Sequence, residues 1–162
     1  MSSGVFTVAS SNGAASLYEA LSLAQGLMKN PEKTKTATIR MKAEKGGGSY
    51  SYKYADLPAV IDAIREPFAK NGLSHRAEFR SIEGQSELEL IVSISHSSGG
   101  EISSRIVIPG AGSDPKGFAA NMTYFRRYLL CGLAGIAADD DTDGEPESAS
   151  EPVKKLKMDA FE

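Results

Sequence analysis

The chain has 162 residues with 41% hydrophobic and 24% charged residues, a balance that favours one folded domain over an intrinsically disordered chain. Its single cysteine excludes an internal disulfide framework, and no apolar run reaches the roughly 20 residues that a membrane-spanning helix needs. Charge is unevenly placed: residues 1–138 carry 15 Lys and Arg against 12 Asp and Glu, whereas residues 139–162 carry 3 Lys against 9 Asp and Glu, which indicates a mildly basic body followed by an acidic tail.

The beginning of the chain predicts an arm followed by a helix. Residues 1–15 are small and polar and are expected to form a flexible arm. The segment Ser16-Leu17-Tyr18-Glu19 fits a capping box, and the apolar residues after it repeat at helical spacing. A helix is therefore predicted from Ser16 to the stop signal Asn30-Pro31.

Two alternating segments then predict a β-hairpin. The first is Thr36–Lys42, the second contains Tyr50, Tyr52 and Tyr54, and Gly46–Gly48 lies between them. Because alternate side chains of a strand point the same way, the three tyrosines are expected to share one face.

A second and a third helix are each predicted to begin at an aspartate. Asp56 is expected to cap the second helix, with a kink or an end at Pro67 and a C-terminal cap at Asn71-Gly72. Asp114-Pro115 is expected to open the third helix, which has a strong apolar stripe and ends near Gly135.

Three strands are predicted between these helices, over Leu73–Ile82, Leu88–His96 and Ile102–Ile108. Short turns separate them, so they are expected to form an antiparallel meander. The order of elements predicts an α+β fold with a mostly antiparallel sheet, made of the hairpin and the meander, and helices packed on one face. The folded domain is expected to span residues 16–138, with residues 139–162 as a disordered acidic tail.

The third helix carries a second face of interest. Lys116, Ala120, Thr123 and Arg127 recur at helical spacing opposite the apolar stripe, with Arg126 on the flank. Two long cations beside small residues would let an extended anion lie close to the helix, since the arginine fork suits phosphate. The alternative is a solvated helix face with a surface arginine pair.

Cations and aromatic residues are interleaved around the predicted hairpin. The cations are Arg40, Lys42, Lys45 and Lys53, and the aromatic residues next to them include Tyr52 and Tyr54. Proteins that bind single-stranded nucleic acid combine these two residue types, because cations neutralise phosphates while rings stack on bases. The alternative is that the tyrosines pack against the neighbouring helix.

Motifs for catalysis or for a bound cofactor are missing from the sequence. It contains no P-loop and no nucleophile motif, and two histidines with one cysteine cannot build a His/Cys zinc site. The run Asp139–Gly144 matches the first half of an EF-hand loop, but the twelfth position is Ser150 instead of a carboxylate. No catalytic residue, metal site or cofactor is therefore predicted.

Two separated motifs resemble the Erf family of phage single-strand annealing recombinases. The first motif is Tyr52-Lys53-Tyr54-Ala55-Asp56-Leu57, followed by Val60–Ile64 and Asn71-Gly72-Leu73. The second motif is Thr123-Tyr124-Phe125-Arg126-Arg127-Tyr128, followed by Gly135-Ile136 and the acidic run Asp139–Gly144. The family commonly has a Gly-Ser pair where this chain has Ala119-Ala120. The resemblance covers about residues 15–144.

The resemblance implies ATP-independent annealing of complementary DNA strands in homologous recombination, without enzymatic catalysis. It also implies rings or helical filaments of identical subunits that bind single-stranded DNA, with host or phage recombination proteins as candidate partners. The expected location is the cytoplasm, that of the host cell if the protein is phage-encoded, with no membrane contact. The candidate DNA-binding residues are Arg40, Lys42, Lys45, Tyr52, Lys53, Tyr54, Lys116, Thr123, Arg126 and Arg127.

Two alternative functions remain open from the sequence. One is a metal-dependent nuclease of the same pathway, with Asp139, Asp141 and Asp143 as ligands. The other is a protective single-strand coat protein that does not anneal.

Overall fold

A computed structural model describes residues 11–40, 48–84, 87–108 and 114–139. The remaining residues, including the predicted arm over 1–10 and the predicted tail over 140–162, lie outside this description. The helices and strands follow one another as α1 (Ser11–Leu27), β1 (Lys35–Arg40), β2 (Ser49–Tyr54), α2 (Leu57–Lys70), β3 (Leu73–Ser81), β4 (Leu88–His96), β5 (Glu101–Ile108) and α3 (Pro115–Ala134).

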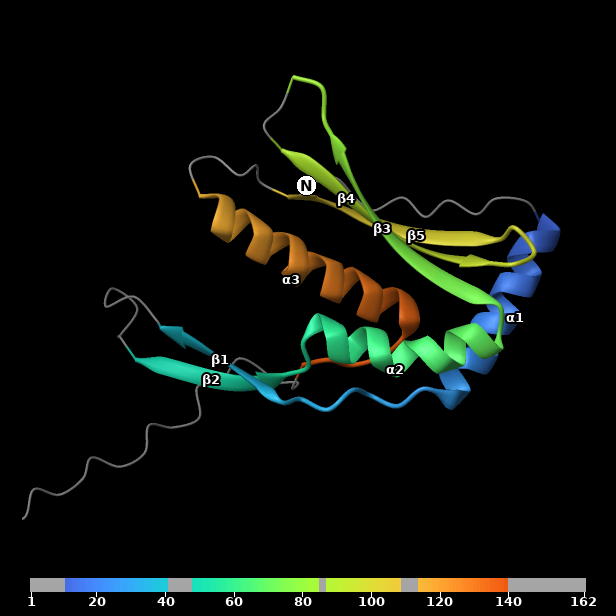
Figure 1. Cartoon of the computed structure of the whole chain (residues 1–162), viewed down its shortest axis with the longest axis horizontal. Helices are drawn as coiled ribbons and strands as arrows, with labels where there is room; N and C mark the ends of the chain where they lie inside the picture. The colour runs from blue at the N-terminus through green and yellow to red at the C-terminus, as the bar shows by residue number, and fades with distance from the viewer. Residues whose placement is uncertain (1–10, 41–47, 85–86, 109–113, 140–162) are drawn as a thin grey trace, which may run out of the picture.

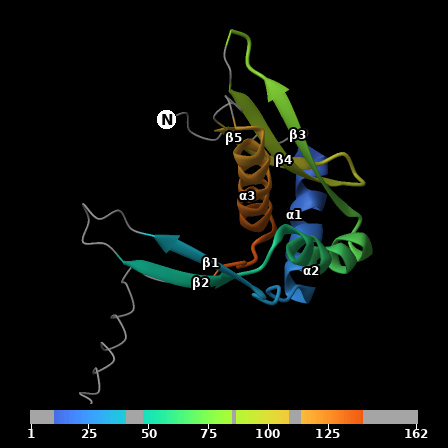
Figure 2. The same ribbon diagram turned by 60° about the vertical axis from the view of Figure 1, so that its left-hand side comes forward.

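The predicted α+β fold is confirmed. β1 and β2 form an antiparallel hairpin, and β3, β4 and β5 form an antiparallel meander in that order. All three helices pack on one face of the meander, and α3 lies between the meander and the hairpin (Figures 1 and 2). Leu90 and Ile94 of β4 are fully buried under the helices, together with Leu17, Ile64 and Leu130.

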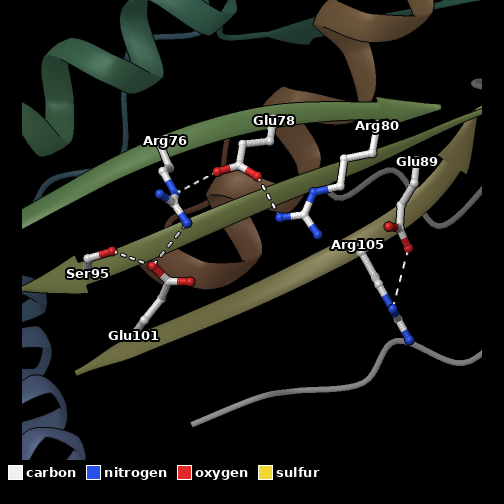
Figure 3. A network of polar contacts seen from close by, with 7 residues as sticks. All are labelled: Arg76, Glu78, Arg80, Glu89, Ser95, Glu101 and Arg105. Atoms are coloured by element: carbon white, nitrogen blue, oxygen red, sulfur yellow. Dashed lines mark hydrogen bonds and ion pairs between the residues drawn. The ribbon is translucent and has the colours of Figure 1, made fainter. Parts of the chain in front are cut away.

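The other face of the meander is charged and exposed to solvent (Figure 3). Arg76 pairs with Glu78 at 3.2 Å and with Glu101 at 3.5 Å, and Arg105 pairs with Glu89 at 3.4 Å. Arg80 also pairs with Glu78, at 2.8 Å, so each described arginine on this face has an acidic partner.

Helix α1 begins at Ser11, five residues before the predicted capping box, so residues 11–15 do not belong to a flexible arm. Tertiary contacts explain the longer helix. The hydroxyl of Ser98 donates to the carbonyl oxygen of Gly13 at 3.4 Å, and Gly100 packs so closely against that carbonyl that a Cβ there would overlap it. The β4–β5 turn therefore stabilises a helical start that the local sequence does not encode.

The predicted caps of the other two helices are confirmed. Asp56 Oδ1 accepts from the N–H of Ala59 at 3.2 Å, and Asp114 Oδ1 accepts from the N–H of Gly117 at 3.0 Å. Helix α2 continues through Pro67 to Lys70, so an end at Pro67 is excluded, and the predicted C-terminal cap at Asn71 is confirmed. The side-chain amide of Asn71 donates to the carbonyl oxygen of Pro67 at 2.8 Å, which satisfies an acceptor in the last turn.

Candidate nucleic-acid interface

The hairpin turns one face toward α3. The register pairs Lys35 with Tyr54 and Ala37 with Tyr52, so these four residues share a face. This arrangement agrees with the predicted tyrosine face for Tyr52 and Tyr54, whose ring centroids are 6.2 Å apart. The side chain of Tyr50 lies outside the described part of the chain.

A groove of about 390 Å³ lies between the hairpin and α3. Three tyrosines, two alanines and a few polar groups form its walls. Its lining residues are Ala37, Tyr52, Tyr54, Asp56, Leu57, Ala120, Thr123, Tyr124 and Arg127. Tyr124 is 45% exposed, whereas Tyr52 and Tyr54 are half-buried. The groove therefore offers aromatic surface that is open to a ligand, with small residues that leave space beside it.

Arg127 closes the inner end of the groove, and its position differs from the prediction. Its side chain is buried, with 5% exposure, and therefore does not continue an exposed cationic ridge from Lys116. The Nη1 atom donates to the Asp139 carboxylate at 2.7 Å and to the carbonyl oxygen of Ala55 at 3.0 Å. The guanidinium carbon lies 4.6 Å from the ring centroid of Tyr54 and 4.8 Å from that of Tyr128.

The segment after α3 explains this burial. It returns to the end of the hairpin, where Asp139 bridges to Tyr54 through the backbone. The N–H of Ala55 also donates to the carbonyl oxygen of Ala138 at 2.7 Å. Helical spacing places Arg127 on the same side as Thr123, but it cannot show that another segment covers that turn of the helix.

The groups around Arg127 have shifted pKa values. Burial acts to lower the pKa of Arg127, but the hydrogen bond and the negative charge of Asp139 outweigh it and raise that pKa. Burial, with hydrogen bonds to Tyr124 and Asp139, raises the pKa of Tyr128 far above its ordinary value. Burial also raises the pKa of the Cys131 thiol to about 11, so this cysteine is a poor nucleophile at neutral pH.

Arg126 and Arg127 point to different sides of α3. Arg126 is half-buried on the side of His75, whose pKa is lowered by burial and then by the charges of Arg126 and Arg65. Among the residues that the structure describes, the buried Nε atom of Arg126 has no hydrogen-bond partner. The two neighbouring arginines therefore do not form a joint surface on the groove.

The remaining predicted cations lie around the groove or outside the description. Lys116 is exposed at the start of α3, one turn before Ala120. Lys53 is exposed and pairs with Thr36, so its side chain lies on the face of the hairpin that does not carry Tyr52. Thr123 lines the groove and donates its hydroxyl to the carbonyl oxygen of Ala119 at 3.2 Å. Lys42, Lys45 and the side chain of Arg40 fall outside the described residues.

Metal-ligating side chains do not cluster in the part of the chain that the structure describes. Within residues 11–139, apart from the three undescribed stretches, no group of three or more His, Cys, Asp or Glu side chains could hold a metal ion. Asp139 is engaged by Arg127, and Asp141 and Asp143 lie beyond the described part. No described helix has the length and apolar character needed to cross a membrane.

The groove brings together two motifs that are far apart in the sequence. Tyr52–Leu57 supplies the hairpin wall and its base, and Thr123–Tyr128 supplies the helical wall. The family model of the ERF superfamily matches residues 17–159, which cover most of the chain. The chain belongs to the ERF superfamily. No curated protein and no solved structure gives a significant match.

Membership of the ERF superfamily relates the chain to phage recombination and to DNA binding. The family is known for annealing proteins and not for catalytic enzymes. Sequence reasoning found both motifs but missed Ala37 and the structural role of Asp139. The alternation of β1 already places Ala37 opposite Tyr52, whereas no local pattern pairs Asp139 with Arg127.

Proposed function

We propose that the protein binds single-stranded DNA in the groove between the hairpin and α3 and anneals complementary strands without ATP during homologous recombination. One observation carries the proposal: the two motifs that resemble the Erf family, about residues 52–57 and 123–128, form opposite walls of one aromatic groove.

The chemistry of the groove suits bases better than phosphates. Tyr52 and Tyr124 present rings on opposite walls, and stacking of a base on an aromatic side chain contributes roughly 1–3 kcal/mol. Stacking tolerates any base, as a protein that anneals any pair of complementary strands requires. Ala37 and Ala120 leave room for a base between the two walls.

Phosphates would lie outside the groove, close to exposed cations. Lys116 at the start of α3 and Lys53 on the outer side of the hairpin are the described candidates, and Lys42 and Lys45 are further candidates from the sequence. Phosphate contacts fix the position of a strand without reading its sequence. Binding of this kind depends little on the DNA sequence and leaves the bases near the aromatic walls.

Annealing needs no external energy source. Stacking within the product duplex contributes roughly 1.4 kcal/mol per base-pair step, so pairing itself drives the reaction. The protein has to hold strands and reduce their repulsion. One small domain makes few contacts, so we propose a ring or helical filament of identical subunits that multiplies them through effective concentration.

An annealing assay with complementary fluorescent oligonucleotides tests the proposal. The wild type is expected to accelerate duplex formation without ATP, and Tyr124→Leu is expected to lower both single-strand affinity and annealing rate. Tyr124→Phe keeps the ring and should retain most activity, and Tyr18→Leu is the matched control, an exposed tyrosine on α1. Size measurement by light scattering during the reaction tests the multimer.

Three results would contradict the proposal. Shortened strands in the presence of Mg²⁺ would indicate a nuclease. Strand binding without faster annealing would indicate a protective coat. Equal binding by the wild type and Tyr124→Leu would place the DNA on another surface.

A further inference from the structure

The hairpin contacts the rest of the described structure mainly at its base. Within the described residues, β1 and β2 pack extensively only on each other. The hairpin projects from the body beside α3, and its far end lies away from the helices (Figure 2). A two-stranded hairpin is only marginally stable alone in water, so contacts at its base must set its orientation.

Arg127 makes two hydrogen bonds at that base. Through one nitrogen it joins α3 to Ala55, which directly follows β2, and to Asp139, which lies in the segment after the end of α3 at Ala134. Its guanidinium also lies over the ring of Tyr54, the last residue of β2. A single buried side chain thus links three segments that are separate in the sequence.

We propose that Arg127 is a positioning residue: its ion pair with Asp139 holds the hairpin at the distance from α3 that keeps the groove open. This inference rests on the proposed function for its link to DNA, but not for the orientation of the hairpin. Arg127 touches the groove only at its inner end, and its charge is already compensated by Asp139 at 2.7 Å. In this proposal phosphates bind at other cations.

A competing account gives Arg127 the opposite role. In that account Asp139 occupies the guanidinium as a substitute for a DNA phosphate, and binding of DNA displaces the carboxylate. The two accounts predict opposite effects when the negative charge of Asp139 is removed. If the ion pair positions the hairpin, its loss weakens DNA binding. If the Asp139 carboxylate competes with a DNA phosphate, its loss strengthens DNA binding.

The decisive variant is Asp139→Asn in the full-length chain, because asparagine keeps the shape of the side chain and removes the charge. Glu66→Gln is the matched control: Glu66 also pairs at 2.7 Å, with Lys70, but on the exposed surface of α2. Hydrogen exchange at the amides of β1, β2 and Ala55, measured without DNA, shows how tightly the hairpin is held to the body. Affinity for a single-stranded oligonucleotide over a range of salt concentrations shows whether the groove still binds DNA and through how many phosphate contacts.

We expect Asp139→Asn to speed exchange in the hairpin and at Ala55 by roughly tenfold. Single-strand affinity should fall, and the slope of log affinity against log salt should stay as in the wild type. Glu66→Gln should change neither quantity. Arg127→Lys and Arg127→Gln should both speed exchange in the hairpin, because neither side chain keeps the flat guanidinium that lies over the ring of Tyr54.

The proposal is overturned by either of two results. One is unchanged exchange in the hairpin of a folded Asp139→Asn protein. The other is tighter DNA binding by Asp139→Asn with a salt slope steeper by about 0.7, the value of one additional phosphate contact on a single strand.

Failure of the proposed function would look different. In that case Tyr124→Leu would leave DNA binding unchanged. Asp139→Asn would still speed exchange in the hairpin, which would support the positioning role of the ion pair.

Discussion

The backbone N–H of Ala55 donates a hydrogen bond of 2.7 Å to the carbonyl oxygen of Ala138. This bond joins the end of the hairpin to the segment that follows α3, and the bridge between Tyr54 and Asp139 continues the contact. The start of the acidic run therefore lies at the inner end of the aromatic groove. Loss of Arg127, which packs between these segments, should affect the groove and the fold together.

Arg127→Ala is expected to lower the free energy of unfolding by about 3–5 kcal/mol, because it leaves the carboxylate of Asp139 partly buried without its cation. Urea denaturation followed by circular dichroism measures the change. Arg65→Ala is the control, since Arg65 forms an exposed ion pair with Asp62 at 3.2 Å that should contribute about 0–1 kcal/mol. Similar losses for both variants would argue against a special role of the buried pair.

Lys116→Ala and Lys53→Ala are expected to weaken single-strand binding to a similar degree for different sequences. Each should flatten the dependence of log affinity on log salt by about 0.7 if one phosphate contact is lost. Titration of fluorescent oligonucleotides at several salt concentrations gives the slope. Lys70→Ala removes an exposed cation of α2 that pairs with Glu66 and should leave the slope unchanged.

Gly100→Ala is expected to destabilise the protein by about 1–3 kcal/mol, because the new methyl group overlaps the carbonyl group of Gly13 and the backbone must move. Gly26→Ala is the opposite control, since a Cβ at this helical position meets no atom within 4 Å. That variant should gain roughly 0.5–1 kcal/mol from helix propensity. Thermal and urea unfolding of both variants test the docking of α1 on the β4–β5 turn.

His75 should make stability depend on pH. Burial, followed by the charges of Arg126 and Arg65, lowers its pKa from the ordinary value of 6.5, so the unfolded chain binds a proton more readily than the folded protein. The resulting contribution to stability is present above about pH 6.5 and is lost as the pH falls toward the lowered value. His75→Gln should flatten the dependence of the unfolding free energy on pH over this acidic window.

Removal of residues 140–162 is expected to tighten single-strand binding at low salt. This segment carries 3 Lys against 8 Asp and Glu, and a tethered polyanion competes with DNA for cations at high local concentration. The gain should shrink as salt rises, because screening acts on both interactions. A second truncation that also removes Asp139 separates this effect from the positioning of the hairpin. If the first truncation binds with the same affinity as the wild type at every salt concentration, the segment has a solubilising or partner-binding role instead.

Local sequence was sufficient for most elements of the fold. The alternation of β4, the Asp-Pro start and glycine end of α3, and the tyrosine alternation of β2 are set by side-chain chemistry within a few residues, so the sequence predicted them well. The resemblance carried by Tyr52–Leu57 and Thr123–Tyr128 also pointed to the segments that form the two walls of the groove.

Tertiary structure decided what depends on segments that are distant in the chain. Helix α1 begins at Ser11 because the β4–β5 turn packs on Gly13, and Arg127 is buried because Asp139 and Ala55 meet it from two other segments. Helical periodicity fixes the direction of a side chain relative to its own axis, but not what covers it. For this reason the sequence placed Arg127 on an open cationic face, whereas the structure places it in a buried ion pair at the base of the hairpin.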